Sequence, residues 1–123
     1  MKTFNEYQIW VRLKAGSERN ERATYALGLA GESGEVCDLL KKHWGHRQPL
    51  DREKLKKELG DVLWYVGAIA DQFDMTLDDV VKANVDKLER RYPDGFTEQA
   101  AAARADERFE LAISPDADDR FRT

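Results

Sequence analysis

The sequence predicts an all-α fold, a four-helix bundle, from three observations. Apolar residues recur every three to four positions over most of the chain, which is the period of a helix with one buried face. No stretch alternates apolar and polar residues as a strand does, and no segment repeats. The length of 123 residues suits one domain with a substantial core and is too short for two. Four helices packed in one bundle satisfy all three observations.

The first two predicted helices flank a polar loop. The first covers roughly residues 3–14, and the loop AGSERNER follows it. The second runs from about residue 23 to 44 and ends where Gly45 and Pro49 stop the helical pattern. Its main core face is predicted to consist of Ala23, Ala26, Ala30, Cys37 and Trp44. A second apolar strip on the same helix consists of Leu29, Val36 and Leu40.

The third and fourth predicted helices are joined by a short turn. The third spans about residues 51–73, with an apolar stripe of Leu55, Leu59, Val62, Val66, Ile69 and Phe73. In the turn DMT, Thr76 serves as the N-cap, and Asp79 three positions on completes a capping-box pattern. The fourth helix continues to about Tyr92, because Pro93 cannot extend it.

The predicted helical domain covers residues 1–96, and residues 97–123 form a C-terminal extension. The extension is rich in alanine at first and then acidic with several arginines. This composition favours a short helix followed by a loose tail.

Composition excludes several classes of protein. A net charge of −4 argues against charge-driven binding to nucleic acid or to an anionic membrane. No apolar run approaches the ~20 residues that a membrane-spanning helix needs. The single Cys37 cannot form an internal disulfide, and one thiol with two histidines makes no zinc site. We therefore expect a cytoplasmic protein without a membrane or nucleic-acid partner.

Two pairs of acidic residues lie beside apolar residues on the second and third helices. Glu32 and Glu35 are three positions apart, and Glu58 and Asp61 repeat this spacing one helix later. Side chains at this spacing are neighbours on a helix, so like charges there repel. Four carboxylates enclosed in a bundle require protonation, water or a cation. Because every ligand atom is oxygen, the hard ions Mg²⁺ and Mn²⁺ are favoured.

The simpler interpretation is that these acids are solvated surface residues. A single Glu-x-x-Glu pair on a helix is usually of that kind. Two such pairs on adjacent helices, each bordered by apolar residues, favour metal binding instead.

The segments that carry these pairs resemble a known family. The strings GLAGESGEV and ELGDVLWY, with 22 residues between Glu35 and Glu58, are similar to the motifs of the MazG-like nucleoside triphosphate pyrophosphohydrolases, an all-α group. The resemblance covers roughly residues 22–96 and includes NVDKLERRYPDGF. It implies that the Mg²⁺ ligands are Glu32, Glu35, Glu58 and Asp61. Gly31 stands where some members have a further glutamate, so four candidate ligands remain in place of five.

The resemblance also implies a reaction, in which a ribo- or deoxynucleoside triphosphate and water give the monophosphate and pyrophosphate. The expected cofactor is Mg²⁺, for which Mn²⁺ can substitute, and a house-cleaning role in the nucleotide pool fits this activity. A carboxylate that is not fully engaged by metal can accept the proton of the attacking water. Glu35 is the first candidate for this general base and Glu32 the second.

Other positions match substrate-binding positions of the family. Lys54, Lys87 and Arg91 resemble phosphate-binding cations, although Lys87 and Arg91 would also stabilise the C-terminal end of their helix through its dipole. Asn84 lies within the apolar stripe of the fourth helix and would contact the sugar, a ligand carboxylate or a structural partner. Tyr65, one turn past Asp61, would stack on sugar or base.

The base pocket is the least defined part of the sequence. Its aromatic candidates are Tyr7, Trp10, Trp44 and Trp64, although aromatic residues at helical spacing are more often core residues. Two apolar strips on the second helix predict at least a dimer, since a lone bundle covers one of them. The resemblance points the same way, to a homodimer or homotetramer with the active site near the interface.

Two alternatives remain at this stage. One is an enzyme like phosphoribosyl-ATP pyrophosphatase, which is a relative by fold. The other is a non-enzymatic helical interaction module, in which the acids pair with basic residues of a partner and no metal is needed. A di-iron carboxylate bundle is disfavoured, because neither acidic pair belongs to a Glu-x-x-His motif.

Overall fold

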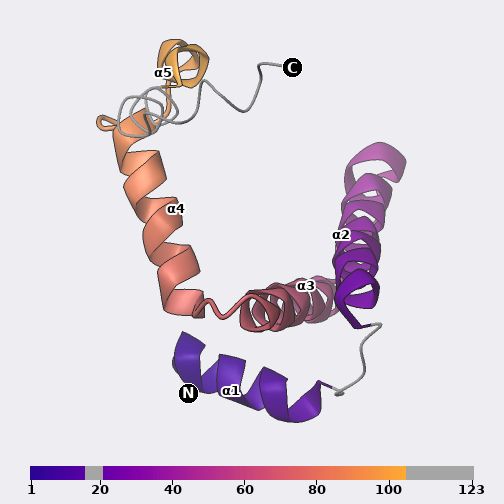
Figure 1. Ribbon diagram of the computed structural model, residues 1–123. Helices are drawn as coiled ribbons and strands as arrows, with labels where there is room; N and C mark the ends of the chain where they lie inside the picture. The colour runs from indigo at the N-terminus through magenta and orange to yellow at the C-terminus, as the bar shows by residue number, and fades with distance from the viewer. Residues whose placement is uncertain (16–20, 105–123) are drawn as a thin grey trace, which may run out of the picture. The chain divides into compact units, whose positions relative to one another are not determined.

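The computed structural model describes residues 1–15 and 21–104, and this part of the chain is helical without strands. The helices are α1 (Phe4–Lys14), α2 (Glu21–His46), α3 (Arg52–Gln72), α4 (Leu77–Arg91) and α5 (Glu98–Ala103) (Figure 1). The predicted all-α class is therefore confirmed for these residues. Two compact units divide the chain, Met1–Val80 and Val81–Thr123. Within the described ranges, no helix has both the length and the apolar character to cross a membrane.

The helices begin where the local sequence provides capping groups. Thr3 and Glu6 form a capping box at α1, in which the Glu6 amide donates to Thr3 Oγ1 at 3.2 Å and the Thr3 amide donates to Glu6 Oε2 at 2.7 Å. Asp51 caps α3 by accepting from the Lys54 amide at 2.9 Å. The predicted box at α4 is confirmed, because the Asp79 amide donates to Thr76 Oγ1 and the Thr76 amide donates to Asp79 Oδ2.

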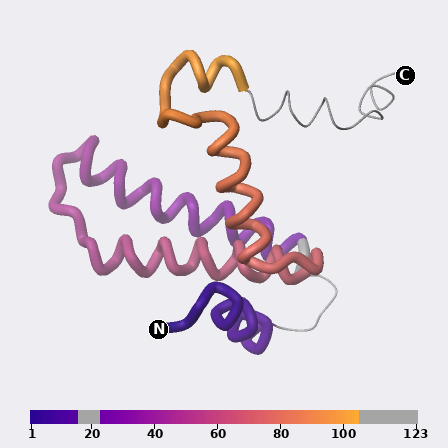
Figure 2. Tube along the Cα trace, turned by 90° about the vertical axis from the view of Figure 1, so that its left-hand side faces the viewer, coloured from indigo at the N-terminus to yellow at the C-terminus, as the bar shows by residue number. Residues whose placement is uncertain are grey.

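Helices α2 and α3 pack against each other and are antiparallel (Figure 2). A five-residue connection, residues 47–51, joins them. Its first residue, Arg47, has a φ of 55°, and Pro49 follows. The His43 ring, at 2.7 Å from the Gln48 carbonyl oxygen, ties the end of α2 to this connection.

The core of the first unit lies where α1, α2 and α3 meet. Val11, Tyr25 and Ala68 are its buried members, one from each helix. Five partly buried residues pack around them: Tyr7, Ala15, Trp64, Tyr65 and Ile69. Two of the aromatic candidates for a base pocket, Tyr7 and Trp64, therefore belong to the edge of this core.

The prediction of the main core face on α2 is wrong. Its five residues, Ala23, Ala26, Ala30, Cys37 and Trp44, are all exposed in the structure. The side of α2 that packs toward α3 instead contains Tyr25 and the half-buried strip of Leu29, Val36 and Leu40. The reason is that α2 carries apolar residues on two sides, so its periodicity alone does not select the side that packs. On α3, similarly, Leu59 and Phe73 of the predicted stripe are more than half exposed.

A buried glutamine links α1 to the turn between α3 and α4. Gln8 is 5% exposed, and its amide nitrogen donates to the Met75 carbonyl oxygen at 2.8 Å. Its side-chain oxygen accepts from the Leu77 amide at 2.9 Å, at the first residue of α4. The sequence pattern did not identify this role, because glutamine is most often a surface residue.

Replacing Gln8 by alanine should lower the free energy of unfolding by about 2 kcal/mol, because the buried Leu77 amide and the part-buried Met75 carbonyl both lose their partner. Chemical denaturation measures this change. Asn5→Ala is the matched control, since Asn5 makes its hydrogen bond to Asp78 at the exposed surface. An equal loss in both variants would contradict the role assigned to Gln8.

Candidate metal centre

Three of the four acids of the predicted metal site come together in the first unit. Glu58 and Asp61 lie one turn apart on α3, and Glu32 faces them from α2. One carboxylate oxygen from each residue lies within 4.8 Å of the others. Glu32 and Glu58 are half-buried, whereas Asp61 is exposed. The packing of α2 on α3 thus assembles an acidic cluster, Glu32, Glu58 and Asp61, in which Glu32 is 26 and 29 positions from the other two along the chain.

The acidic cluster is crowded with negative charge. Desolvation raises the pKa of Glu32 above its ordinary value, and the charges of Asp61, Glu58 and Glu35 raise it further. Among the described residues, no ion pair involves a member of the acidic cluster, while other acids such as Asp71, Asp38 and Glu53 do pair with cations. Within residues 1–15 and 21–104, the cluster therefore has no partner of the kind that a structural salt bridge provides.

The donor set fits a hard divalent cation. Three carboxylates supply oxygen ligands only, which suits Mg²⁺ or Mn²⁺ better than zinc or copper. A bound cation would offset the mutual repulsion that raises the pKa of Glu32. Glu32, Glu58 and Asp61 are the residues that would hold it.

Glu35, the fourth predicted ligand, lies outside the acidic cluster. Its side chain is exposed on α2, one turn after Glu32, and its charge still acts on the Glu32 carboxyl. The structure thus gives Glu35 a position next to the cluster with contact to solvent. Its predicted roles as ligand or general base are both compatible with this position.

Lys54 and Tyr65 lie on the same side of α3 as Glu58 and Asp61, one turn before and one turn after this pair. Lys54 is exposed in the first turn of α3, one turn before Glu58. Tyr65 is half-buried one turn after Asp61, and its ring centroid is 6.2 Å from that of Tyr25 and 5.1 Å from that of Trp64. The predicted cation and the predicted aromatic contact thus border the acidic cluster at opposite ends.

Helix α1 brings a second tyrosine near the acidic cluster. Burial raises the pKa of Tyr7, and the negative charge of Asp61, which lies within electrostatic range of the phenol, raises it further. Tyr7 stacks on Trp10 with ring centroids 5.8 Å apart. The sequence predicted both residues as candidates for a base pocket without placing them relative to the acids, and the position of Tyr7 within range of Asp61 depends on how α1 packs on α3. Trp44, by contrast, is 72% exposed near the end of α2.

The remaining predicted substrate contacts lie on α4 within the second unit. Asn84 is exposed, whereas Lys87 and Arg91 are half-buried and one turn apart. The Arg91 guanidinium carbon lies 5.9 Å from the centroid of the Tyr92 ring. Their role in binding substrate stays a prediction.

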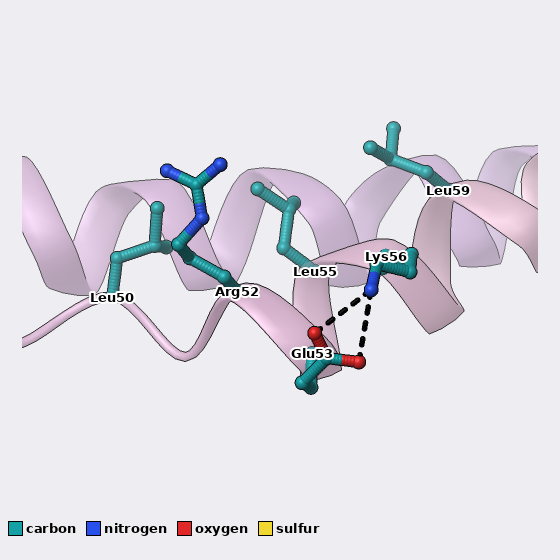
Figure 3. A pocket seen from close by; sticks show the side chains of 6 residues that line it. All are labelled: Leu50, Arg52, Glu53, Leu55, Lys56 and Leu59. Carbon is teal, nitrogen blue, oxygen red and sulfur yellow. Dashed lines mark hydrogen bonds and ion pairs between the residues drawn. The ribbon is translucent and has the colours of Figure 1, made fainter.

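A shallow hollow of about 470 Å³ lies at the start of α3 and does not include the acidic cluster. Its lining combines three leucines with charged residues: Leu50, Arg52, Glu53, Leu55, Lys56 and Leu59 (Figure 3). Lys56 and Glu53 form an ion pair across its edge at 2.8 Å. The chemistry expected of the carboxylates is therefore not located in this hollow.

The raised pKa of Glu32 predicts how stability depends on pH in the presence of a chelator. Since the folded protein holds the proton more tightly than the unfolded chain, this group favours folding below its ordinary pKa of 4.5. That contribution is lost as the pH rises from 4.5 through the higher pKa of the folded state. Glutamine has no proton to lose. The stability of Glu32→Gln relative to that of the wild type should therefore rise as the pH increases across this range. Melting temperatures from pH 4 to 8 measure the difference, and a difference independent of pH would contradict the assignment.

Comparison with known proteins adds an independent finding. The profile of a family described as "MazG nucleotide pyrophosphohydrolase domain" matches residues 20–96. A stretch of 69 residues is 39% identical to "Gene 37 protein" of Mycobacterium phage L5. This stretch covers 53% of the chain and 60% of the phage protein, so the match spans less than two thirds of that relative. No solved structure matches the chain significantly.

Proposed function

Because the chain belongs to the MazG nucleotide pyrophosphohydrolase domain family, we propose that it hydrolyses nucleoside triphosphates to monophosphates and pyrophosphate. The observation that carries this proposal is the acidic cluster, in which two helices of the matched region bring three carboxylates within 4.8 Å. Among the described residues no cation partner neutralises them, which argues against the alternative of a purely structural set of ion pairs.

The acidic cluster would hold Mg²⁺, for which Mn²⁺ can substitute. When bound, such an ion neutralises phosphate oxygens and lowers the pKa of a coordinated water. Glu32, Glu58 and Asp61 would hold this ion, and the ion would supply the positive charge that a triphosphate needs beside these carboxylates. Lys54, exposed one turn before Glu58, is the cation that we propose for a phosphate oxygen beyond the cluster.

Glu35 is the general base of the proposed reaction. It accepts a proton from water while the water oxygen bonds to the α-phosphorus, and the bond from that phosphorus to the bridging oxygen breaks. The electron pair of this bond leaves with pyrophosphate. The position of Glu35 outside the acidic cluster and in contact with solvent supports this role, because a carboxylate that is not a ligand remains free to take the proton. Glu32, within the cluster, is the second candidate.

The substrate contacts complete the proposal. Lys87 and Arg91 on α4 are the phosphate-binding cations that the family resemblance implies, and Asn84 on the same helix is a candidate contact for the sugar or a ligand carboxylate. Tyr65 supplies an aromatic surface at the end of the acidic cluster. We include deoxynucleotides among the substrates and place the activity in removal of unwanted nucleotides from the pool.

The assembly that we propose is a four-helix bundle paired into a homodimer or homotetramer. Large apolar side chains at the surface of the described residues support it, among them Leu27, Trp44 and Leu59, which are each at least half exposed. A second copy would cover these side chains.

A panel of nucleotides tests the proposed function. Ribo- and deoxynucleoside triphosphates, with phosphoribosyl-ATP as a separate arm, are incubated with the protein in Mg²⁺, in Mn²⁺ and in chelator. We expect monophosphate and pyrophosphate from at least one triphosphate, with either metal and not in chelator. Cleavage of phosphoribosyl-ATP alone would identify the related pyrophosphatase instead, and no cleavage of any compound would reject an enzymatic role.

A further inference from the structure

The ring of Tyr65 lies directly against the backbone of Gly28, where no side chain fits. A methyl group at Gly28 would overlap Cε1 and Cζ of the Tyr65 ring and would lie 2.8 Å from its hydroxyl oxygen. Real methyl groups do not approach other atoms this closely, so the ring would have to move. The other glycines of α2, Gly31, Gly34 and Gly45, would meet no atom within 4 Å. The absence of a side chain therefore matters at Gly28 alone among these four.

The Tyr65 ring is also held from other directions. Trp64 and Tyr25 both contact it edge to face. Their ring centroids lie 5.1 Å and 6.2 Å, respectively, from the centroid of the Tyr65 ring. Tyr25 lies one turn before Gly28 on α2 and belongs to the buried core. Besides the backbone of Gly28, two aromatic side chains therefore limit how far the Tyr65 ring can move.

Both residues lie one turn from the acidic cluster. Gly28 precedes Glu32 by four positions on α2, and Tyr65 follows Asp61 by four positions on α3. Residues four apart are neighbours on a helix surface. The contact between Gly28 and Tyr65 is thus the next layer of the helix pair after the layer that gathers the carboxylates.

From this placement, and resting on the proposed function, we propose that Gly28 is a positioning residue for nucleotide binding. Because Gly28 has no side chain, the phenol ring of Tyr65 can pack directly on the backbone of α2. This contact sets the position of the ring relative to the acidic cluster. The ring then forms one wall of the nucleotide site, against which the sugar lies. Gly28 acts through Tyr65 and touches no substrate itself.

The test compares Gly28→Ala with Gly45→Ala in the full chain. Both variants add the same methyl group to α2, but only the first meets the Tyr65 ring. We expect Gly28→Ala to raise KM for the triphosphate about tenfold, while kcat and the Mg²⁺ concentration for half-maximal activity stay within about twofold. Gly45→Ala should leave all three values at those of the wild type. A KM for Gly28→Ala equal to that of the wild type, in an active wild-type enzyme, overturns the inference and leaves the proposed function intact.

A second pair of variants shows whether the methyl group acts through the ring. In a Tyr65→Ala background, which lacks the ring, adding Gly28→Ala should change KM no further. A further tenfold rise there overturns the inference. If Gly28→Ala alone does not fold, circular dichroism of the double variant decides: a folded double variant supports the contact with Tyr65, and an unfolded one overturns it. A wild type that cleaves no nucleotide fails the proposed function before this comparison begins.

Discussion

Replacing Asp61 by asparagine is expected to reduce pyrophosphate release by roughly three orders of magnitude. Asp61 is one of the three carboxylates within 4.8 Å that would hold Mg²⁺. A bound metal supplies several kcal/mol of stabilisation to the transition state, and about 1.4 kcal/mol corresponds to a tenfold change in rate. The measurement is the rate of pyrophosphate release at saturating nucleotide and Mg²⁺.

The control for Asp61→Asn is Glu53→Gln, which removes an exposed acid of the same helix that pairs with Lys56. This variant should keep the wild-type rate. In chelator, Asp61→Asn should be at least as stable as the wild type, because it removes a like charge from beside Glu32. A much lower melting temperature in chelator, together with retained activity, would show that the acidic cluster is a structural feature.

Glu35→Gln should lower kcat by a factor of about 10²–10⁴, the usual contribution of a general base. The amide keeps the size of the side chain and cannot accept the proton of the attacking water. Asp38→Asn is the matched control on the same helix, one turn further along. Lys42 and Lys41 donate to the Asp38 carboxylate and lower its pKa to about 2, so this acid is already engaged away from the acidic cluster. A kcat for Glu35→Gln within twofold of the wild type would contradict the role of Glu35.

The same variant separates the two roles predicted for Glu35. If Glu35 acts as base alone, the Mg²⁺ concentration for half-maximal activity stays at the wild-type value. If it is also a fourth ligand, this concentration rises together with the loss in kcat. Its exposed position outside the acidic cluster leads us to expect the first result.

The sequence was sufficient to predict the helices and the acidic pairs. Helical boundaries followed from local signals such as Thr76 with Asp79, which form the expected capping box in the structure. The pairing of Glu58 with Asp61 needed only the spacing of a helix. These features are local, so no knowledge of the packing was required to find them.

The packing of α2 could not be predicted in the same way. Apolar residues on two sides of this helix offered two faces, and the one with Ala23, Ala26 and Cys37 is exposed. The helix turns Tyr25 and Glu32 toward α3 instead, which places Glu32 in the acidic cluster and leaves Glu35 outside it. A rotation about the helix axis decides this difference, and the periodicity of α2 does not fix that rotation.

Contacts between distant segments were also beyond the sequence. Gln8 bonds to residues 67 and 69 positions away, and Tyr7 comes within range of Asp61. Gly28 looked like one of several glycines in α2 that reduce helix stability, and only the structure shows that the Tyr65 ring needs its missing side chain. Each of these roles depends on tertiary placement, for which a single sequence holds no direct signal.

The most direct test of the central claim is hydrolysis of a preferred triphosphate in water enriched in ¹⁸O with Mg²⁺ present. Mass spectrometry of the products locates the new oxygen. If water attacks the α-phosphorus beside the acidic cluster, one labelled oxygen appears in the monophosphate, and pyrophosphate carries none. Labelled orthophosphate released together with the diphosphate would contradict the account, because it would place the cleavage at the terminal phosphate.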